Sequence, residues 1–196
     1  MSDLRRQTAV FVAGPPGVGK STVARRVAAA LRGAWVDIDA TVGPFVQLLA
    51  GHGREDVRAA IYASLLETAE ASLAAGLHVV VSAPFTEERR DPAAWARVAD
   101  RVASCGAHPV LVWLHAPREV VVERLAARGA ARDADKLADP LSWLRGAEPD
   151  AAPRAPHLAV EATGDADVTA GKILQALAPR AGADAAPIVV PSRSFR

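Results

Sequence analysis

Short apolar runs alternate with longer amphipathic stretches along the whole chain. The apolar runs predict strands near residues 8–13, 34–38, 77–83, 109–115 and 157–162. The longer stretches predict helices near 20–31, 54–75, 92–104, 117–127 and 166–178, with a shorter helical piece at 45–50. Strands that alternate with helices are typical of βαβ units. The order therefore predicts an α/β fold with a five-stranded parallel sheet and helices on both faces.

Two segments do not follow this alternation. Residues 129–156 are rich in Arg, Asp, Pro and Gly and contain one brief apolar patch, Leu141 to Leu144. A long polar segment inside a compact domain is typical of a mobile lid. Residues 179–196 follow the last predicted helix and predict a C-terminal tail. We therefore expect one domain over residues 1–178, with a lid at about 129–156.

Composition narrows the classes of function. A chain of 196 residues that is 51% hydrophobic can form one domain with a sizeable core. The formal net charge is +1 and there is no basic block, which argues against a nucleic-acid partner. Cys105 is the only cysteine, so no intramolecular disulfide can form, and a reducing cytoplasm is the expected compartment. The first apolar run is too short for a signal peptide or a membrane span.

A glycine-rich motif lies between the first predicted strand and the first predicted helix. It satisfies the pattern G-x-x-x-x-G-K-[ST], with Gly14, Pro15, Pro16, Gly17, Val18, Gly19, Lys20, Ser21 and Thr22. Its glycines let backbone N–H groups turn toward an anion. Lys20 is expected to reach the β- and γ-phosphates of a nucleotide, and Ser21 to ligate Mg²⁺. An ordinary turn has no need of Lys and Ser here, in a chain with only three lysines.

Two carboxylates follow the second predicted strand, at Asp37 and Asp39. Alternate residues of a strand point the same way, so both are expected to face a crevice at the carboxyl end of the sheet. One would hold Mg²⁺ through water, and the other would accept a proton from a substrate hydroxyl. The alternative is that one of them caps the next helix or turn.

With these motifs, residues 8–177 resemble the shikimate kinases, gluconate kinases and related small P-loop metabolite kinases, a branch close to the nucleoside monophosphate kinases. The resemblance implies a three-layer P-loop NTPase fold and use of ATP and Mg²⁺. It also implies transfer of the γ-phosphoryl group to a hydroxyl of a small, anionic acceptor. It gives Asp37 a metal-binding role and Asp39 a base-like role on the acceptor. Arg58, in the stretch 53–58, would anchor the acceptor's anionic group.

Other arginines enter through the same resemblance. Residues 116–125 are similar to the segment that leads into the lid of these kinases, which implies that Arg124 lies beside adenine. Arg128 and Arg132 would then lie near the transferred phosphate. The spacing of these three residues puts them on one face if the helix continues, and an exposed helical surface is the alternative. Arg89 is a further candidate for the acceptor site, with a solvent-exposed helix start as its alternative.

The chain also departs from these kinases. The third predicted strand lacks the triple glycine of shikimate kinases and has no acidic residue at its end. The identity of the phosphoryl acceptor therefore cannot be inferred from shikimate kinases. Open alternatives are a nucleoside monophosphate kinase, an antibiotic or sugar-nucleotide kinase, and an ATPase switch that acts on a protein partner. A monomer and a homodimer both fit the sequence. Trp35, Trp95 and Trp113 fall on apolar faces and are expected in the core.

Overall fold

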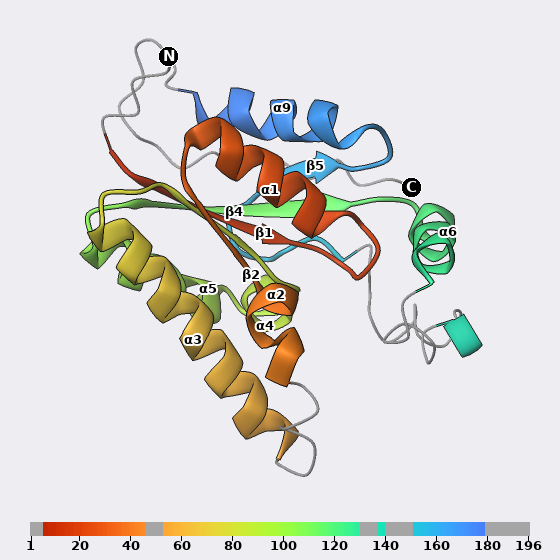
Figure 1. Cartoon of the computed structure of the whole chain (residues 1–196), viewed down its shortest axis with the longest axis horizontal. Helices are drawn as coiled ribbons and strands as arrows, with labels where there is room; N and C mark the ends of the chain where they lie inside the picture. The colour runs from red at the N-terminus through yellow and green to blue at the C-terminus, as the bar shows by residue number, and fades with distance from the viewer. Residues whose placement is uncertain (1–5, 46–52, 130–136, 140–150, 179–196) are drawn as a thin grey trace.

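The elements form three layers, a parallel sheet between two layers of helices (Figure 1). The computed structural model describes residues 6–45, 53–129, 137–139 and 151–178. The strands are β1 (Thr8–Ala13), β2 (Ala34–Asp37), β3 (Val79–Ser82), β4 (His108–His115) and β5 (Leu158–Glu161). All pairings are parallel, and the strand order is β2-β3-β1-β4-β5. The predicted α/β class, with five parallel strands and helices on both faces, is confirmed.

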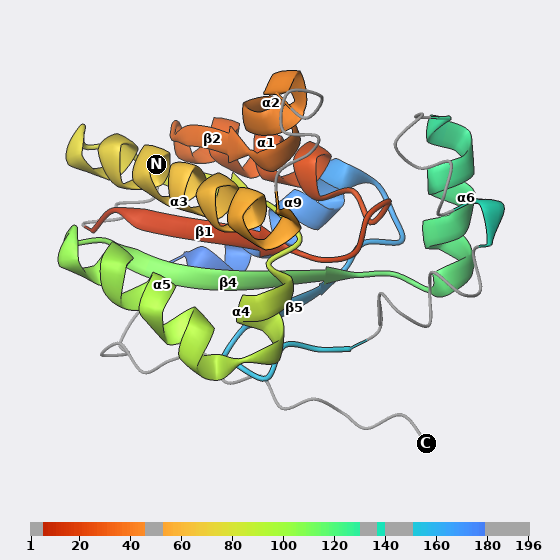
Figure 2. The same cartoon turned by 90° about the horizontal axis from the view of Figure 1, so that it is seen from below.

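Helices cover both faces of this sheet (Figure 2). On one face α1 (Lys20–Leu31) and α9 (Ala166–Leu177) pack together, and on the other lie α3 (Arg54–Ala74) and α5 (Pro92–Ser104). Helix α6 (Arg118–Arg128) follows β4 and packs its buried Val121 and Leu125 next to the loop after β1. Three short pieces fill the connections: α2 (Ile38–Val42), the 3-10 helix η1 (Gly43–Phe45) and α4 (Thr86–Arg90).

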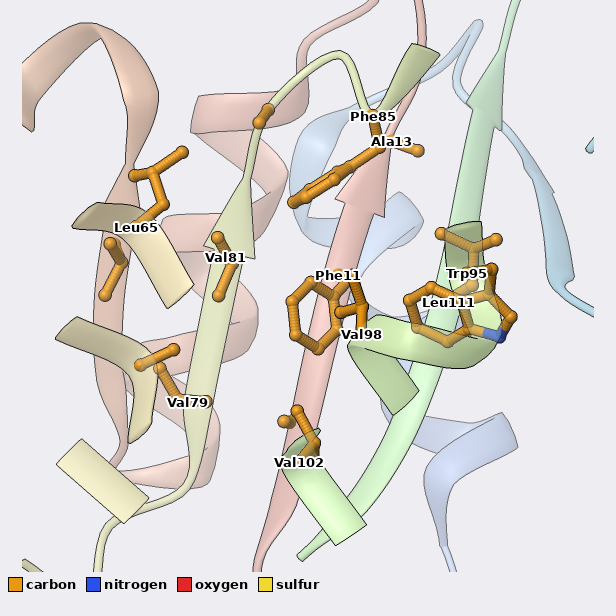
Figure 3. Close-up of a cluster of buried hydrophobic side chains, with 14 of the residues drawn as sticks. Phe11, Ala13, Leu65, Val79, Val81, Phe85, Trp95, Val98, Val102 and Leu111 are labelled. Carbon is orange, nitrogen blue, oxygen red and sulfur yellow. The ribbon is translucent and has the colours of Figure 1, made fainter. Parts of the chain in front are cut away.

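Strand β1 is apolar throughout because both of its faces are covered. All six of its residues are buried. Phe11 points toward α5, with its ring centroid 5.5 Å from that of Phe85 and 5.4 Å from that of Trp95, both edge to face (Figure 3). Val10 and Val12 pack on the opposite side, among the residues of α1 and α9. Removing such a ring costs roughly 3–5 kcal/mol. This packing fixes the end of β1, from which the glycine-rich loop leaves.

The structure corrects two expectations. Ile38 was expected in a strand but begins α2, because Asp37 caps that helix. Helix α6 ends at Arg128, where Gly129 takes a φ of 58°, whereas Arg132, the third predicted arginine, lies outside the described residues. Trp35 is 37% exposed on the edge strand β2, whereas Trp95 and Trp113 are buried as expected.

Several predicted segments lie outside the described residues: 46–50 of the short helical piece, 130–136 and 140–150 of the lid, and the tail 179–196. The end of the predicted lid segment is described, and it packs on the body. Ala155 is buried in the core, and the backbone N–H of Arg154 donates to the carbonyl of Arg89 at 2.9 Å.

Within the described ranges, no helix is both long and apolar enough to span a membrane.

Candidate active site

A cavity of about 510 Å³ opens at the carboxyl ends of the strands. This is where ligands bind in open α/β sheets. Five parts of the chain line it: the glycine-rich loop with the start of α1, the β2–α2 junction, the end of β3, helix α6 and the connection from β5 into α9. Segments far apart in the sequence therefore meet around one space, and most of the predicted site residues belong to them.

The glycine-rich loop has the backbone that its sequence predicts. Gly17 and Gly19 have φ values of 83° and 101°, which glycine adopts without strain. A Cβ on Gly17 would come within 2.9 Å of the carbonyl oxygen of Val121, so α6 can pack directly on the loop. Gly19 is the N-cap of α1, whose first backbone N–H groups and positive dipole end attract anions. The loop is thus suited to bind phosphate.

Lys20 is the first residue of α1, and its amino group turns back over the loop. The Nζ atom donates to the carbonyl oxygen of Pro15 at 2.9 Å. Burial lowers the pKa of Lys20 to about 8, while the carboxylates of Asp39 and Asp37 oppose this shift. The guanidinium groups of Arg128 and Arg89 lower the pKa further. The structure therefore brings both predicted aspartates and two of the predicted arginines into the electrostatic range of Lys20.

Asp37 ends β2 and is held by three hydrogen bonds. Its Oδ1 accepts from the backbone N–H groups of Asp39 at 3.0 Å and Ala40 at 3.1 Å. Its Oδ2 accepts from the hydroxyl of Ser82 at 2.5 Å. The helix-capping alternative is therefore correct for Asp37, and the capping carboxylate also lines the cavity.

Asp39 reaches the same cavity by a different route from the expected one. It does not alternate with Asp37 along a strand, because it lies in the first turn of α2. Its side chain is exposed, and it lines the cavity together with Asp37. The expectation that both carboxylates face one crevice is confirmed, although the geometric reason for it was wrong.

The oxygen atoms at this site fit Mg²⁺. Ser21 and Asp37 both line the cavity and offer a hydroxyl and a carboxylate. Mg²⁺ prefers such oxygen ligands and usually keeps several of its waters, so one or two protein groups suffice beside phosphate oxygens. The residues predicted to hold the metal therefore lie in suitable positions.

Arg124 connects the glycine-rich loop to the connection after β5. Its guanidinium donates to the carbonyl oxygens of Val18 at 3.2 Å, Ala162 at 2.7 Å and Thr163 at 3.2 Å. Arg128, one turn later on α6, also lines the cavity. The cavity continues along Ala162, Gly164 and Thr169, so there is room beyond the loop for the base of a nucleotide.

The two arginines predicted to face the acceptor have different surroundings. Arg58 is exposed on α3, with its Cζ 5.6 Å from the centroid of the Tyr62 ring, and it is not among the residues that line the cavity. Arg89 is 7% exposed, and its Nη2 donates to the carbonyl oxygen of Ala151 at 2.7 Å. The alternative of a solvent-exposed helix start is therefore wrong for Arg89.

A buried carboxyl group lies beside Arg58 and Tyr62. Glu88 is 8% exposed, and burial raises its pKa. Within the described part of the chain, its Oε2 has no hydrogen-bond partner. Tyr62 accepts a hydrogen bond from the backbone N–H of Phe85 at 3.1 Å, and burial raises its pKa to about 12. Phe85 follows Pro84, which lines the cavity, so this group joins α3 to the end of β3.

Ser82 is one of the residues at this site that the sequence did not reveal. It ends β3 and pairs with Asp37 across the β2–β3 register. A serine after three valines reads as the end of an apolar strand, and its partners lie 45 and 47 positions away in the sequence. The sequence showed only that this strand ends without an acidic residue. That absence did not predict the hydrogen bond between Ser82 and Asp37.

The family described as AAA domain matches residues 10–146 of this chain. Among curated proteins, the shikimate kinase of Nitrobacter winogradskyi is 34% identical over 140 residues, which are 67% of this chain and 58% of that protein. The chain thus spans less than two thirds of the length of this relative.

Solved structures share the fold. A putative kinase from Chloroflexus aurantiacus superposes with a TM-score of 0.65 at 22% identity, covering 88% of this chain and 96% of the other. An APS kinase from Mycobacterium tuberculosis, solved in complex with AMPPNP and APS, gives a TM-score of 0.57 at 24% identity, covering 88% and 98%. At these identities the likeness shows the fold alone.

Proposed function

Because the chain belongs to the AAA domain family, we propose that it is an ATP-dependent kinase that transfers the γ-phosphoryl group to an oxygen of a small, anionic metabolite. One observation carries the proposal. Lys20 lies on a phosphate-binding loop within the electrostatic range of Asp37, Asp39 and Arg128, around a single cavity. The shikimate kinase relative supports the same chemistry, and the kinase neighbours share the fold.

The loop and its lysine would hold the triphosphate. Backbone N–H groups at the start of α1 bind phosphate oxygens, and the amino group of Lys20 moves from the carbonyl of Pro15 to the β- and γ-phosphates. Ser21 and Asp37 would hold Mg²⁺, which when bound neutralises charge on the phosphates. Arg124, bonded to the carbonyls of Val18 and Ala162, keeps the loop and the base-binding end of the cavity together.

Asp39 would act on the acceptor. Its exposed carboxylate accepts a hydrogen bond from the acceptor hydroxyl and takes the proton as the new O–P bond forms. The bond between the γ-phosphorus and the bridging oxygen breaks at the same time, and ADP leaves with the electron pair. Arg128 lies at the end of α6 and would neutralise charge on the transferred group, a role that we also assign to Arg132.

The acceptor would carry a carboxylate, a phosphate or a similar anion. We propose that Arg58, which lies over the Tyr62 ring on α3 and outside the cavity lining, binds this anion at the edge of the cavity. Arg89 is buried and donates to the carbonyl of Ala151, so it holds the end of the proposed lid segment. We propose that the lid segment, about residues 129–156, closes over both substrates. We propose a cytoplasmic enzyme, which the single cysteine fits. It would act as a monomer or a homodimer.

The test is ADP release from ATP and Mg²⁺ with a panel of small molecules. Anionic hydroxylated metabolites should stimulate turnover well above the rate with ATP alone, and neutral polyols should not. Stimulation by a protein fraction alone would indicate a nucleotide-dependent switch. Stimulation by nucleoside monophosphates would indicate a nucleotide acceptor and contradict the metabolite proposal.

A further inference from the structure

Three side chains form a hydrogen-bond relay at the edge of the cavity. The indole Nε1 of Trp35 donates to the Oγ of Ser82 at 3.0 Å, and the Ser82 hydroxyl donates to Oδ2 of Asp37 at 2.5 Å. The register explains how they meet. Asp37 pairs with Ser82, and Trp35 lies two residues before Asp37 on the same face of β2.

The chemistry of the groups fixes the direction of the relay. An indole N–H only donates, and a hydroxyl has one proton to give. Since Ser82 accepts from Trp35, its own proton is oriented toward the carboxylate of Asp37. Together with the two backbone donors on Oδ1, Asp37 then receives three hydrogen bonds from the protein. A carboxylate offers about four acceptor positions, so about one remains for a ligand.

Exposure separates the roles of the three residues. Ser82 and Asp37 both line the cavity, but Ser82 is 0% exposed and Asp37 is 5% exposed, so the carboxylate is the group that a bound ligand reaches. Trp35 is 37% exposed, on an edge strand, although its N–H is engaged within the site. Ser82 therefore acts through Asp37, and Trp35 acts through Ser82.

We propose that Trp35 and Ser82 are positioning residues that aim the one remaining acceptor position of Asp37 at the Mg²⁺ of the bound nucleotide. This inference rests on the proposed function, and it deepens the role given to Asp37. With a single position available, Asp37 would contact the hydrated metal at one point. The third strand ends in Ser82 and not in an acidic residue, as the sequence indicates. In the relay this serine orients the carboxylate of Asp37 on the neighbouring strand, so the carboxylate comes from β2.

The affinity for an ATP analogue, measured with Mg²⁺ and with EDTA, tests the relay without turnover. Ser82→Ala should reduce the Mg²⁺-dependent gain in affinity by about tenfold, the worth of one hydrogen bond to a charged group. Trp35→Phe should reduce it by about threefold, because Ser82 keeps its hydroxyl but loses its orientation. The affinity in EDTA should stay unchanged. In the double variant the loss should match that of Ser82→Ala, because the relay is already broken.

Two variants serve as controls. Ser72→Ala removes a hydroxyl that bonds the carbonyl of Thr68 on α3. Trp113→Phe removes a buried indole N–H that has no hydrogen-bond partner among the described residues. Both should keep the full Mg²⁺-dependent gain. A uniform loss in all four single variants would mean that the effect is general destabilisation, and it would overturn the proposal.

The indole N–H resonances give a second readout that does not depend on a nucleotide. The Trp35 resonance should move in Ser82→Ala and stay in place in Ser72→Ala. A wild-type protein with no Mg²⁺-dependent gain would overturn the proposed function and this inference with it. A wild-type gain that persists undiminished in Ser82→Ala would overturn the inference alone.

Discussion

Replacing Arg124 by Ala should weaken both the fold and the binding of nucleotide. The guanidinium group makes three hydrogen bonds to carbonyl oxygens, two of them on the β5–α9 connection and one on the glycine-rich loop. The substitution therefore releases the glycine-rich loop from the β5–α9 connection.

The magnitude follows from the number and quality of these bonds. A net worth of about 1 kcal/mol for each hydrogen bond, reduced for the exposed carbonyl of Thr163, gives a loss of about 2 kcal/mol. For a chain of this size, that corresponds to a fall in Tm of about 4–8 °C. We expect the Kd of an ATP analogue to rise by about tenfold, because binding must restore the separation of the loop and this connection.

Arg101→Ala is the matched control. Arg101 makes two hydrogen bonds to Glu70, at 2.7 and 2.9 Å, between an exposed side chain on α5 and a half-buried one on α3. Such surface pairs contribute about 0–1 kcal/mol. Calorimetric unfolding and analogue titration on both variants compare the two arginines directly. If Arg124→Ala lowers Tm no more than Arg101→Ala and leaves Kd unchanged, the bridging role assigned to Arg124 is wrong.

The remaining predictions concern the reacting groups. Asp39→Asn should lower kcat by about 10²–10⁴ and leave the Kd of Mg²⁺ and ATP unchanged, because the carboxylate acts in proton transfer; equal kcat values would refute this role. Arg58→Ala should raise KM for the acceptor far more than KM for ATP, and an unaltered acceptor KM would place the anion site elsewhere. The pKa of Lys20 lies near 8 without nucleotide, and contact with phosphate raises it, so binding takes up a proton. Affinity for ATP should therefore fall as pH rises above about 8, with a buffer-dependent enthalpy that is lost in Lys20→Ala. A pH-independent affinity between about pH 8 and 10 would contradict the contact.

The strands and long helices were predictable because their patterns are local. Central parallel strands are apolar on both faces, so an uninterrupted apolar run such as Thr8–Ala13 predicts a buried strand directly. The short helices were harder. Helix α4 consists of the five residues Thr86–Arg90, four of them charged, and carries no periodic apolar pattern. Its buried Arg89 takes its environment from residues 151–154, far along the chain.

The local geometry of the site was predictable only where its parts are contiguous in sequence. The conformation of the loop from Gly14 to Thr22 is set by residues within the loop itself. Its residues and its function of binding phosphate therefore follow from the motif. The surroundings of Asp37 depend on strand pairing, which joins it to Ser82, 45 positions later. Arg124 was expected beside a base, but its bonds to the carbonyls of Val18, Ala162 and Thr163 depend on how α6 meets two separate loops.

Transfer of label from γ-labelled ATP to small molecules tests the central claim most directly. The wild-type protein and Lys20→Ala are each incubated with Mg²⁺ and a pool of anionic metabolites, and the labelled products are separated by chromatography. We expect a labelled small molecule with the wild type and at least about 10²-fold less with Lys20→Ala, while the variant keeps its Tm. The proposed kinase activity would be contradicted if the wild type released only labelled phosphate or labelled a protein, or if folded Lys20→Ala labelled the acceptor as well as the wild type does.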